Sequence, residues 1–442
     1  MPSLKTETLK KWTSEVLSNP TLSLAATVAV NADVQETLLR RESRIANTTD
    51  VFSHVVEPLG APITNQKSSG RCWLFAATNV LRIELMKKYN IEKLQLSPSF
   101  LFFYDKLEKS NFFLENIVKT ADEDVDSRIV QHLLTDPISD GGQFGMIQNI
   151  LEKYGLVPND IFPDTFNTTQ SNRVNELVVT LLHQYAQELR EAKKAGKDTA
   201  ALKEEQMQRV HQLLTIFLGT PLGPNDEFDW EFTDKDKKFH RIKTTPLKFY
   251  KDVIGFDATQ TVSLLNDPRN DYERVIHIDR LGNVVGAPEV HYLNVDIDVL
   301  ANKAIEQIKE NKAVFFGTHT PIYHHNPTGI IDTKLWDYKS IGFDPKQSKA
   351  DRLRYHESLM THAMAFVGVH LDEDGKPVRW KVENSWGEER GSKGYYTLTH
   401  DFFKEFVYQV VVDKKQIPEY ADALKTEPIT LPPWDPCGAL AM

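Results

Sequence analysis

Cysteine is scarce in this chain of 442 residues, which contains only Cys72 and Cys437. Two thiols are too few for a disulfide framework, so we expect a reducing compartment. No stretch approaches the roughly 18 consecutive apolar residues of a membrane helix, and the charged N-terminal segment does not match a secretory signal. We therefore expect a cytoplasmic protein without a membrane-spanning segment.

An excess of positive charge is also absent, because 52 Lys and Arg residues face 62 Asp and Glu residues and give a net charge of −10. This balance disfavours nucleic-acid binding over the whole surface. The densest basic stretch, residues 235–243, is interrupted by Asp236, so we interpret it as a solvated face, with a local nucleic-acid site as the alternative. Repeats and low-complexity tracts are missing, which leaves an ordinary globular protein with a buried core.

Helical patterns dominate the first half of the chain and strand patterns the second, which predicts an α+β fold. An amphipathic helix is expected at residues 4–18, followed by an irregular stretch to about residue 70. A buried helix begins at Cys72 and ends at Lys87 and Lys88. The further expected elements are two helices in 173–218 joined near 196–198, and late strands at 363–371, 378–383 and 406–412.

Cys72 stands in the first turn of its predicted helix. There the helix macrodipole can lower a thiol pKa from about 8.5 into the range of about 3.5 to 7.5 and supply a nucleophilic thiolate. Gln66, six residues upstream, can bring its amide to the same place and, with a backbone N–H, form an oxyanion hole. The alternative is that Cys72 is a small buried hydrophobe, as most free cysteines are.

A nucleophilic thiol needs a base, and the base needs an orienting partner. His362 begins one strand-like run and Asn384 follows another, with the turn-forming residues 372–377 between them. In an antiparallel hairpin, the numbers of any two paired residues have the same sum. If this sum is 746, His362 lies opposite Asn384, with Cβ atoms about 5 Å apart. Trp386 could then cover their hydrogen bond. The alternative is a core histidine and a turn asparagine.

Three further histidines lie close together in the sequence. His319, His324 and His325 have no companion cysteine or carboxylate at ligand spacing, so we interpret them as surface or packing residues. No metal ligand and no cofactor is predicted.

The residues from Gln66 to Ala76, together with His362 and the Asn384-Ser385-Trp386-Gly387 motif, resemble the papain-like cysteine peptidases. The order Cys, His, Asn is also the order of that family. The resemblance implies a two-lobe fold, one lobe helical and one a β-sheet, with catalysis by Cys72, His362, Asn384 and Gln66. Gly141 and Gly142 look like the glycine pair with which the family binds extended substrates.

The separation of 290 residues between Cys72 and His362 exceeds what a papain-like core needs. Such insertions, Arg71 before the nucleophile and the ending at 432–442 are similar to the bleomycin hydrolase and aminopeptidase C branch of the family, over essentially the whole chain. This branch implies a homohexameric barrel with an internal chamber. It also implies a C-terminal arm in each cleft, with Ala441 and Met442 at the substrate.

Such an arm would block further subsites and pair its carboxylate with a substrate's free α-amino group, so the expected activity is that of an aminopeptidase. Peptides with free N-termini, and amides such as bleomycin or homocysteine thiolactone, are the substrates that the resemblance implies. Its fungal members imply in addition that Met442 is trimmed. A non-catalytic oligomeric chamber that binds single-stranded nucleic acid is the alternative function.

These expectations divide the chain into five parts. The predicted parts are an N-terminal extension (1–60), a helical lobe with the nucleophile (61–170), a helical insertion (171–255), a β lobe with His362 and Asn384 (256–430) and the C-terminal arm (431–442).

Overall fold

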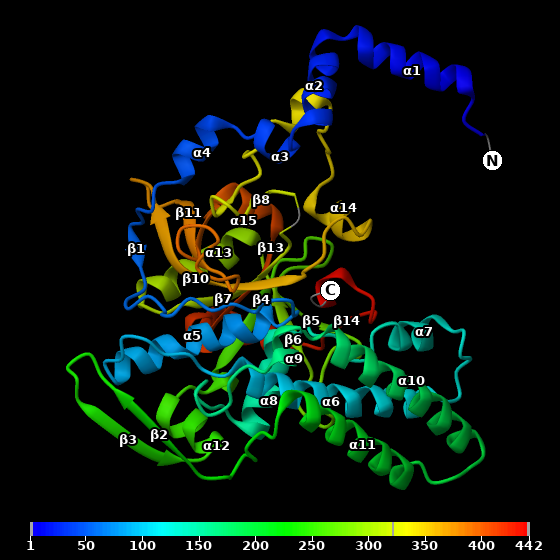
Figure 1. The fold of residues 1–442 in the computed structure, drawn as a ribbon, viewed down its shortest axis with the longest axis vertical. Helices are drawn as coiled ribbons and strands as arrows, with labels where there is room; N and C mark the ends of the chain where they lie inside the picture. Colours follow the sequence, from blue (N-terminus) through cyan, green and yellow to red (C-terminus); the bar gives the residue numbers. More distant parts are fainter. Residues whose placement is uncertain (1–2, 321, 440–442) are drawn as a thin grey trace.

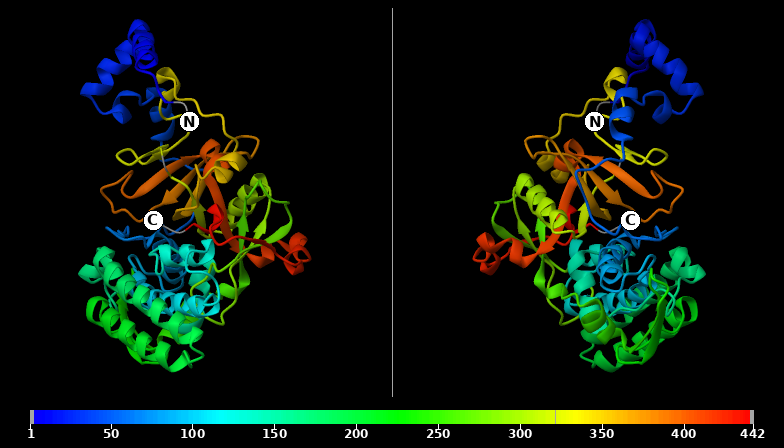
Figure 2. Two further views of the ribbon diagram at one scale, coloured as in Figure 1. Left: turned by 90° about the vertical axis from the view of Figure 1, so that its right-hand side faces the viewer. Right: turned by 90° about the vertical axis from the view of Figure 1, so that its left-hand side faces the viewer.

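The computed structural model describes residues 3–320 and 322–439. Its longest axis runs from the N-terminal helices at one end, through a large sheet, to a group of helices and a two-stranded hairpin at the other end (Figure 1). Side views show the segment near the C-terminus between the sheet and these helices (Figure 2). The predicted combination of helices and sheet is confirmed.

The N-terminal segment is helical almost throughout. Its elements are α1 (Thr6–Ser18), α2 (Pro20–Asn31), α3 (Val34–Thr37) and α4 (Arg41–Asn47). The helix expected at 4–18 is confirmed. The irregular stretch expected up to residue 70 is wrong for residues 20–47, which form α2 to α4, and is confirmed for the rest apart from the short strand at 54–55. The missed signals were local: Asn19 accepts hydrogen bonds from two N–H groups of α2, Pro20 begins that helix, and the Asp33 side chain caps α3.

A helical layer surrounds one buried helix. Its elements are α5 (Cys72–Lys88), α6 (Pro98–Lys119), α7 (Arg128–Thr135), α8 (Phe144–Tyr154), α9 (Phe166–Thr169), α10 (Asn172–Lys194), α11 (Ala200–Leu218) and α12 (Pro246–Lys248). Helix α5 is buried on almost every side, as predicted, and α10 and α11 confirm the expected helix pair. None of the helices within the described ranges has the length and apolarity needed to cross a membrane.

A separate hairpin was not foreseen. Strands β2 (Phe228–Thr233) and β3 (Phe239–Thr244) pair with each other only. Trp230 anchors them because its ring packs edge-on against Tyr89 and Phe249.

Twelve strands of the described chain form one mixed sheet. They are β1 (His54–Val55), β4 (Thr261–Leu265), β5 (Arg274–Ile278), β6 (His291–Asn294), β7 (Val314–Thr318), β8 (His324–His325), β9 (Ile330–Ile331), β10 (His362–Leu371), β11 (Pro377–Glu383), β12 (Tyr395–Thr399), β13 (Val407–Asp413) and β14 (Ile429–Leu431). The three expected late strands are confirmed as β10, β11 and β13. Helices α13 (Ile297–Lys309), α14 (Lys349–Arg354) and α15 (His400–Phe406) accompany the sheet.

The central strand β10 positions the site. It lies between β7 and β11 and packs against α5, the helix that begins with Cys72. One apolar core joins α5 to the helical layer and to Ala363 in β10, whereas a second core lies within the sheet and its helices. The N-terminus of a buried helix and the start of a buried strand are thus held together by packing on both sides.

Candidate active site

Cys72 is the first residue of α5, and its side chain is buried. The sulfur lies near the backbone N–H of Ala363, which places it beside the start of β10, next to His362. Burial raises the pKa of the Cys72 thiol to about 11, although backbone N–H groups lower it in part. The expected lowering of the thiol pKa is therefore wrong, because loss of water outweighs the dipoles at the helix N-terminus.

The hydrogen bonds of Asn384 define the protonation state of His362. Oδ1 of Asn384 accepts a hydrogen bond from the backbone N–H of Ser385 at 2.8 Å, which identifies this atom as the amide oxygen. The same oxygen lies 3.1 Å from Nε2 of His362, so Nε2 must carry the proton and donate it. Nδ1 of the neutral ring is then the nitrogen that can accept a proton. Trp386 stacks on the ring at 4.8 Å between centroids, as expected.

Burial lowers the pKa of His362 to about 4, although the hydrogen bond with Asn384 raises it. Burial thus favours the neutral form of both the imidazole and the thiol of Cys72. Any chemistry by this pair must begin with transfer of the thiol proton.

The strand register that was predicted to join His362 to Asn384 is wrong. Ala365 pairs with Glu383, which gives a sum of 748 instead of 746, and His362 itself pairs with Thr318 of β7. A bulge further along β10 changes the register again. Asn384 lies just beyond the end of β11, and its side chain reaches the imidazole from there.

Gln66 forms hydrogen bonds with two segments beside the site, the loop that precedes Cys72 and the residue that follows Asn384. Its side-chain Nε2 donates a hydrogen bond to the carbonyl of Ser69 at 2.6 Å, and its Oε1 accepts one from the hydroxyl of Ser385 at 2.7 Å. Its backbone N–H donates to the carbonyl of Ser385 at 2.9 Å. The amide is therefore fixed with its NH2 group toward the loop that precedes Cys72.

Asp140, just before the glycine pair, is the centre of a buried polar network. Its carboxylate accepts hydrogen bonds or pairs with Gly70 N–H (3.0 Å), Asn175 (2.8 Å), the Lys106 ammonium (2.6 Å) and the Ser171 hydroxyl. Burial would raise the pKa of Asp140, but Lys106 and these hydrogen bonds hold it well below its usual range. The loop before Cys72 is thus held by an ionised carboxylate.

The glycine pair contacts the residue after the nucleophile. The indole N–H of Trp73 donates a hydrogen bond to the carbonyl of Asp140 at 2.7 Å, and a Cβ at position 142 would lie 2.6 Å from the Trp73 ring. Only glycine fits at this close approach. The ammonium of Lys109 also donates to the carbonyl of Gly141 at 2.5 Å. Gly141 and Gly142 are therefore adjacent to the Cys72 segment, and their binding of substrate stays a prediction.

Sequence reasoning missed the supporting charges of this loop. Lys106 and Lys109 are buried in α6, and Lys109 also pairs with Asp105 at 2.7 Å. The available signal was four charged residues within the five positions 105–109 of a helix rich in phenylalanine. Buried charges of this kind are almost always paired, so they indicated a structured acidic or carbonyl partner.

The C-terminal arm, red in Figure 2, lies between the sheet and the helical layer, and Trp434 and Ala439 line a cavity there. Its described contacts are Trp434 with the Arg128 guanidinium (3.8 Å to the ring centroid), Asp435 with Arg269 (2.8 Å) and the Ala439 carbonyl with Nε2 of Gln143 (3.0 Å). Gln143 directly follows the glycine pair, so the arm reaches the loop that contacts Trp73. Ala441 and Met442 lie outside the described residues.

Comparisons with known proteins agree with this arrangement. The model of the Peptidase C1-like family matches residues 3–438. A Saccharomyces cerevisiae protein named "Cysteine proteinase 1, mitochondrial" is 47% identical over 99% of this chain and 93% of its own length. The Mus musculus bleomycin hydrolase is 40% identical over 99% of both chains.

A solved structure is also similar over the whole chain. The crystal structure of PepW from Lactobacillus rhamnosis has a TM-score of 0.95 and 38% identity, and covers 99% of both chains. The papain-like fold with insertions is therefore confirmed, and the chain is a cysteine peptidase. By its full-length match to the family model and to these relatives, the chain belongs to the Peptidase C1-like family, in its bleomycin hydrolase branch.

Proposed function

We propose that this protein is a cysteine aminopeptidase in which Cys72 is the nucleophile, His362 the base and Asn384 the residue that orients the base. Nδ1 of His362 takes the thiol proton while the sulfur attacks the carbonyl carbon of the substrate. The backbone N–H of Cys72 and the amide of Gln66 stabilise the oxyanion. His362 then returns the proton to the leaving amine, which leaves a thioester on Cys72.

Water completes the reaction. His362 takes a proton from the water as the oxygen attacks the thioester, and it returns that proton to the sulfur as the acid product leaves. The overall change is hydrolysis of one amide bond, with the thiol and the imidazole restored.

The observation that carries this proposal is the tautomer of His362. A ring held by Asn384 with Nε2 protonated has its only free lone pair on Nδ1. The sulfur of Cys72 lies against the backbone of the next residue, Ala363. A core histidine and a turn asparagine would not need this fixed polarity beside a buried thiol.

The arm supports the aminopeptidase specificity. It enters beside the glycine pair, and the Gln143–Ala439 hydrogen bond fixes the direction of its last described residue. By the resemblance to the family, residues 440–442 are proposed to fill the positions where a longer N-terminal extension of a substrate would lie. Their terminal carboxylate offers a partner for an α-ammonium group, by the resemblance to the family.

Deleting residues 439–442 is therefore expected to change specificity. The full chain should hydrolyse an aminoacyl fluorogenic amide with a free N-terminus and leave the N-acetylated compound intact. The truncated chain should cleave N-acetylated peptides internally, because the subsites are open, and should lose preference for the free amine. Initial rates on both compounds measure this change, and unchanged selectivity would remove the arm from the account.

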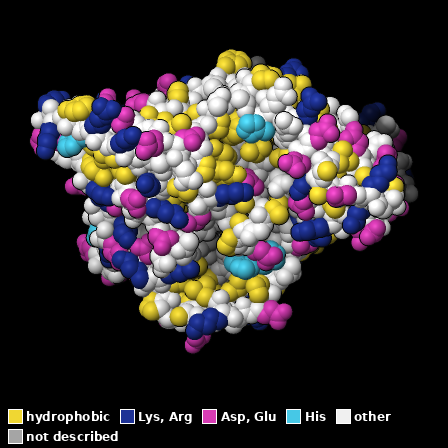
Figure 3. All heavy atoms as spheres, turned by 90° about the horizontal axis from the view of Figure 1, so that it is seen from below, with side chains coloured by type: hydrophobic (Ala, Val, Ile, Leu, Met, Phe, Trp, Pro, Cys, Tyr) yellow, Lys and Arg dark blue, Asp and Glu magenta, His cyan; other side chains and the backbone are white. Residues whose placement is uncertain are grey.

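The rival function, a chamber that binds single-stranded nucleic acid, has less support. The basic stretch 235–243 forms part of the hairpin, where Arg241 pairs with Asp229 at 2.7 Å and Lys243 with Glu227 at 2.7 Å. On the face shown in Figure 3, basic and acidic side chains are interspersed. If the reduced wild-type chain does not hydrolyse the amide, the nucleic-acid-binding function is favoured instead.

The proposed assembly follows from the resemblance to the family, whereas the proposed compartment follows from the cysteine content. We expect a homohexamer around an internal chamber, with peptides or amides as substrates; light scattering measures its size. The cytoplasm is the proposed compartment on the cysteine content. The yeast relative has "mitochondrial" in its name, which makes the mitochondrion the alternative.

A further inference from the structure

Strands β5 and β6 bring two histidines together at a place that the peptidase reaction does not use. His277 and His291 are direct partners in this antiparallel pair, so their side chains project from the same face of the sheet. Glu289 lies in the segment that precedes β6, and its carboxylate reaches both imidazoles from there. His277 is too far from Glu289 and His291 in the sequence to form a local motif with them, so only the strand register reveals the cluster.

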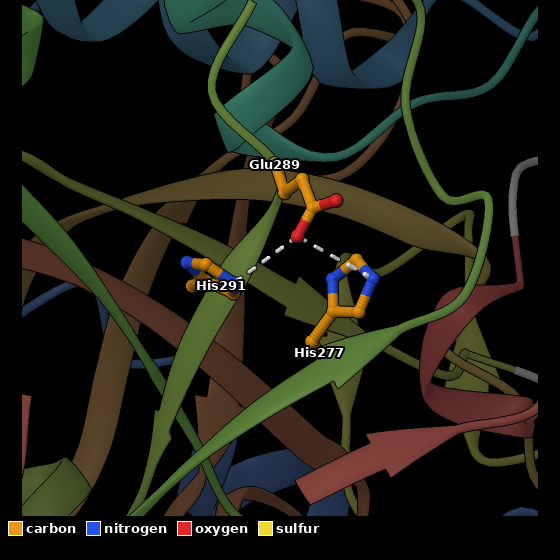
Figure 4. Close-up of side chains that lie close together, drawn as sticks. All are labelled: His277, Glu289 and His291. Carbon is orange, nitrogen blue, oxygen red and sulfur yellow. Dashed lines mark ion pairs between the residues drawn. The ribbon is translucent and has the colours of Figure 1, made fainter. Parts of the chain in front are cut away.

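The three side chains point toward one another (Figure 4). Oε2 of Glu289 lies 3.7 Å from Nε2 of His277 and 3.8 Å from Nε2 of His291, and one ligand atom from each residue lies within 4.8 Å of the others. Neither distance is that of a hydrogen bond. Two ligands about 2.1 Å from one metal ion are about 3.4 Å apart in tetrahedral geometry and at most about 4.2 Å.

The orientation of His277 strengthens this interpretation. Its Nδ1 lies 3.3 Å from the carbonyl of Val290, which can only accept, so Nδ1 carries the proton. The lone pair of Nε2 is then directed to the side of the Glu289 carboxylate. Two electron-rich atoms that face each other are stabilised by a cation between them. Metal-binding histidines commonly donate their second ring N–H to a backbone carbonyl in this way.

We propose that His277, Glu289 and His291 bind one divalent transition-metal ion of the Zn²⁺ class. Imidazole nitrogen with a single carboxylate favours Zn²⁺, Co²⁺, Ni²⁺ or Cu²⁺ over Mg²⁺ and Ca²⁺. Glu289 and His291 also line a cavity of about 640 Å³, which leaves space for water as a fourth ligand. The bound ion would cross-link β5, β6 and the segment that precedes β6.

A second group of potential ligands in the described chain is a weaker candidate. Asp267, Asp435 and Cys437 also lie together, but the guanidinium of Arg269 already pairs with both carboxylates at 2.8 Å. A positive charge therefore occupies that position, whereas no lysine or arginine pairs with Glu289 among the ion pairs of the described residues.

Isothermal titration calorimetry with Zn²⁺ tests the proposal on the full-length chain without a histidine tag. Cys72→Ala serves as the parent, because it removes the thiol at the peptidase site. We expect one Zn²⁺ per chain, and affinity at least ~100-fold weaker after His277→Gln or His291→Gln. The matched control is His211→Gln, an exposed histidine on α11, which should bind Zn²⁺ like the parent.

Two further measurements separate a loss of metal binding from a loss of folding and identify the type of site. Circular dichroism of each variant without metal reports folding, and His291 is the safer position because its side chain is 45% exposed. Visible absorption of bound Co²⁺ reports its coordination. Zn²⁺ binding that persists in both variants, binding lost only after Cys437→Ala, or no binding by the parent would each overturn the proposal.

Discussion

Replacing Cys72 with alanine is expected to lower kcat for an aminoacyl amide by at least ~10⁴-fold, because removal of a nucleophile removes the covalent route entirely. The fold should be unaffected, since alanine occupies less space at the helix N-terminus and introduces no polar group. Steady-state kinetics on the reduced protein measure the loss, and thermal unfolding reports the fold.

Cys437 offers a matched control for this substitution. It is the only other thiol of the chain and is also fully buried, but it lies in the arm. Cys437→Ala should keep kcat within a few-fold of the wild type. Comparable losses in the two variants, or substantial activity without the Cys72 thiol, would contradict the assignment of the nucleophile.

The second large effect concerns a buried ion pair behind the site. Arg82 of α5 pairs with Glu383, the last residue of β11, and both side chains are fully buried. Arg82 also donates to the carbonyl of Pro62 at 2.6 Å. Burial raises the pKa of Glu383 and the guanidinium lowers it, so the carboxylate needs this partner to stay charged. The pair fixes the segment that carries Asn384 to the helix that carries Cys72.

Glu383→Gln is therefore expected to destabilise the protein by about 3–5 kcal/mol, because it leaves the charge of Arg82 buried without a partner. Urea denaturation measures the change in the free energy of unfolding. The matched control is Glu227→Gln, which breaks the exposed pair with Lys243 and should cost less than about 1 kcal/mol. Equal effects at the two positions would show that the buried pair does not hold the lobes together.

A double variant separates the pair from the packing around it. Replacing both Arg82 and Glu383 with apolar residues should be less destabilising than the sum of the single replacements, because no unpaired charge remains. Lower kcat/KM in Glu383→Gln at a temperature where it stays folded would further indicate that the pair positions Asn384.

The sequence indicated which residues meet at the site but not the strand register that brings them together, and their catalytic roles stay a prediction. The residue types at 72, 362 and 384 indicated a thiol, a base and an orienting amide, and the structure brings the imidazole to Asn384 and the sulfur to Ala363. The strand pairing failed because the register between β10 and β11 shifts twice, between Phe366 and Gly368 and between His370 and Leu371, and a symmetric hairpin around the turn takes no account of such bulges.

Burial was the other property that local patterns did not supply. The position of Cys72 at a helix N-terminus is visible in the sequence, but the loss of water that raises its pKa depends on β10, which is almost 300 residues away. For the same reason Lys106 was visible as a charge in an apolar helix, whereas its partner Asp140 was not. Long-range contacts decide such pairs.

The rate at which a small alkylating reagent modifies Cys72, measured against pH in the wild type and in His362→Ala, tests most directly whether the imidazole activates the thiol. Burial raises the thiol pKa to about 11, so an unassisted thiol reacts appreciably only in alkaline solution. Mass spectrometry of the peptide that contains Cys72 locates the adduct. We predict that the wild type reacts at least ~100-fold faster than His362→Ala at neutral pH. Coinciding pH profiles would contradict the pairing of Cys72 with His362.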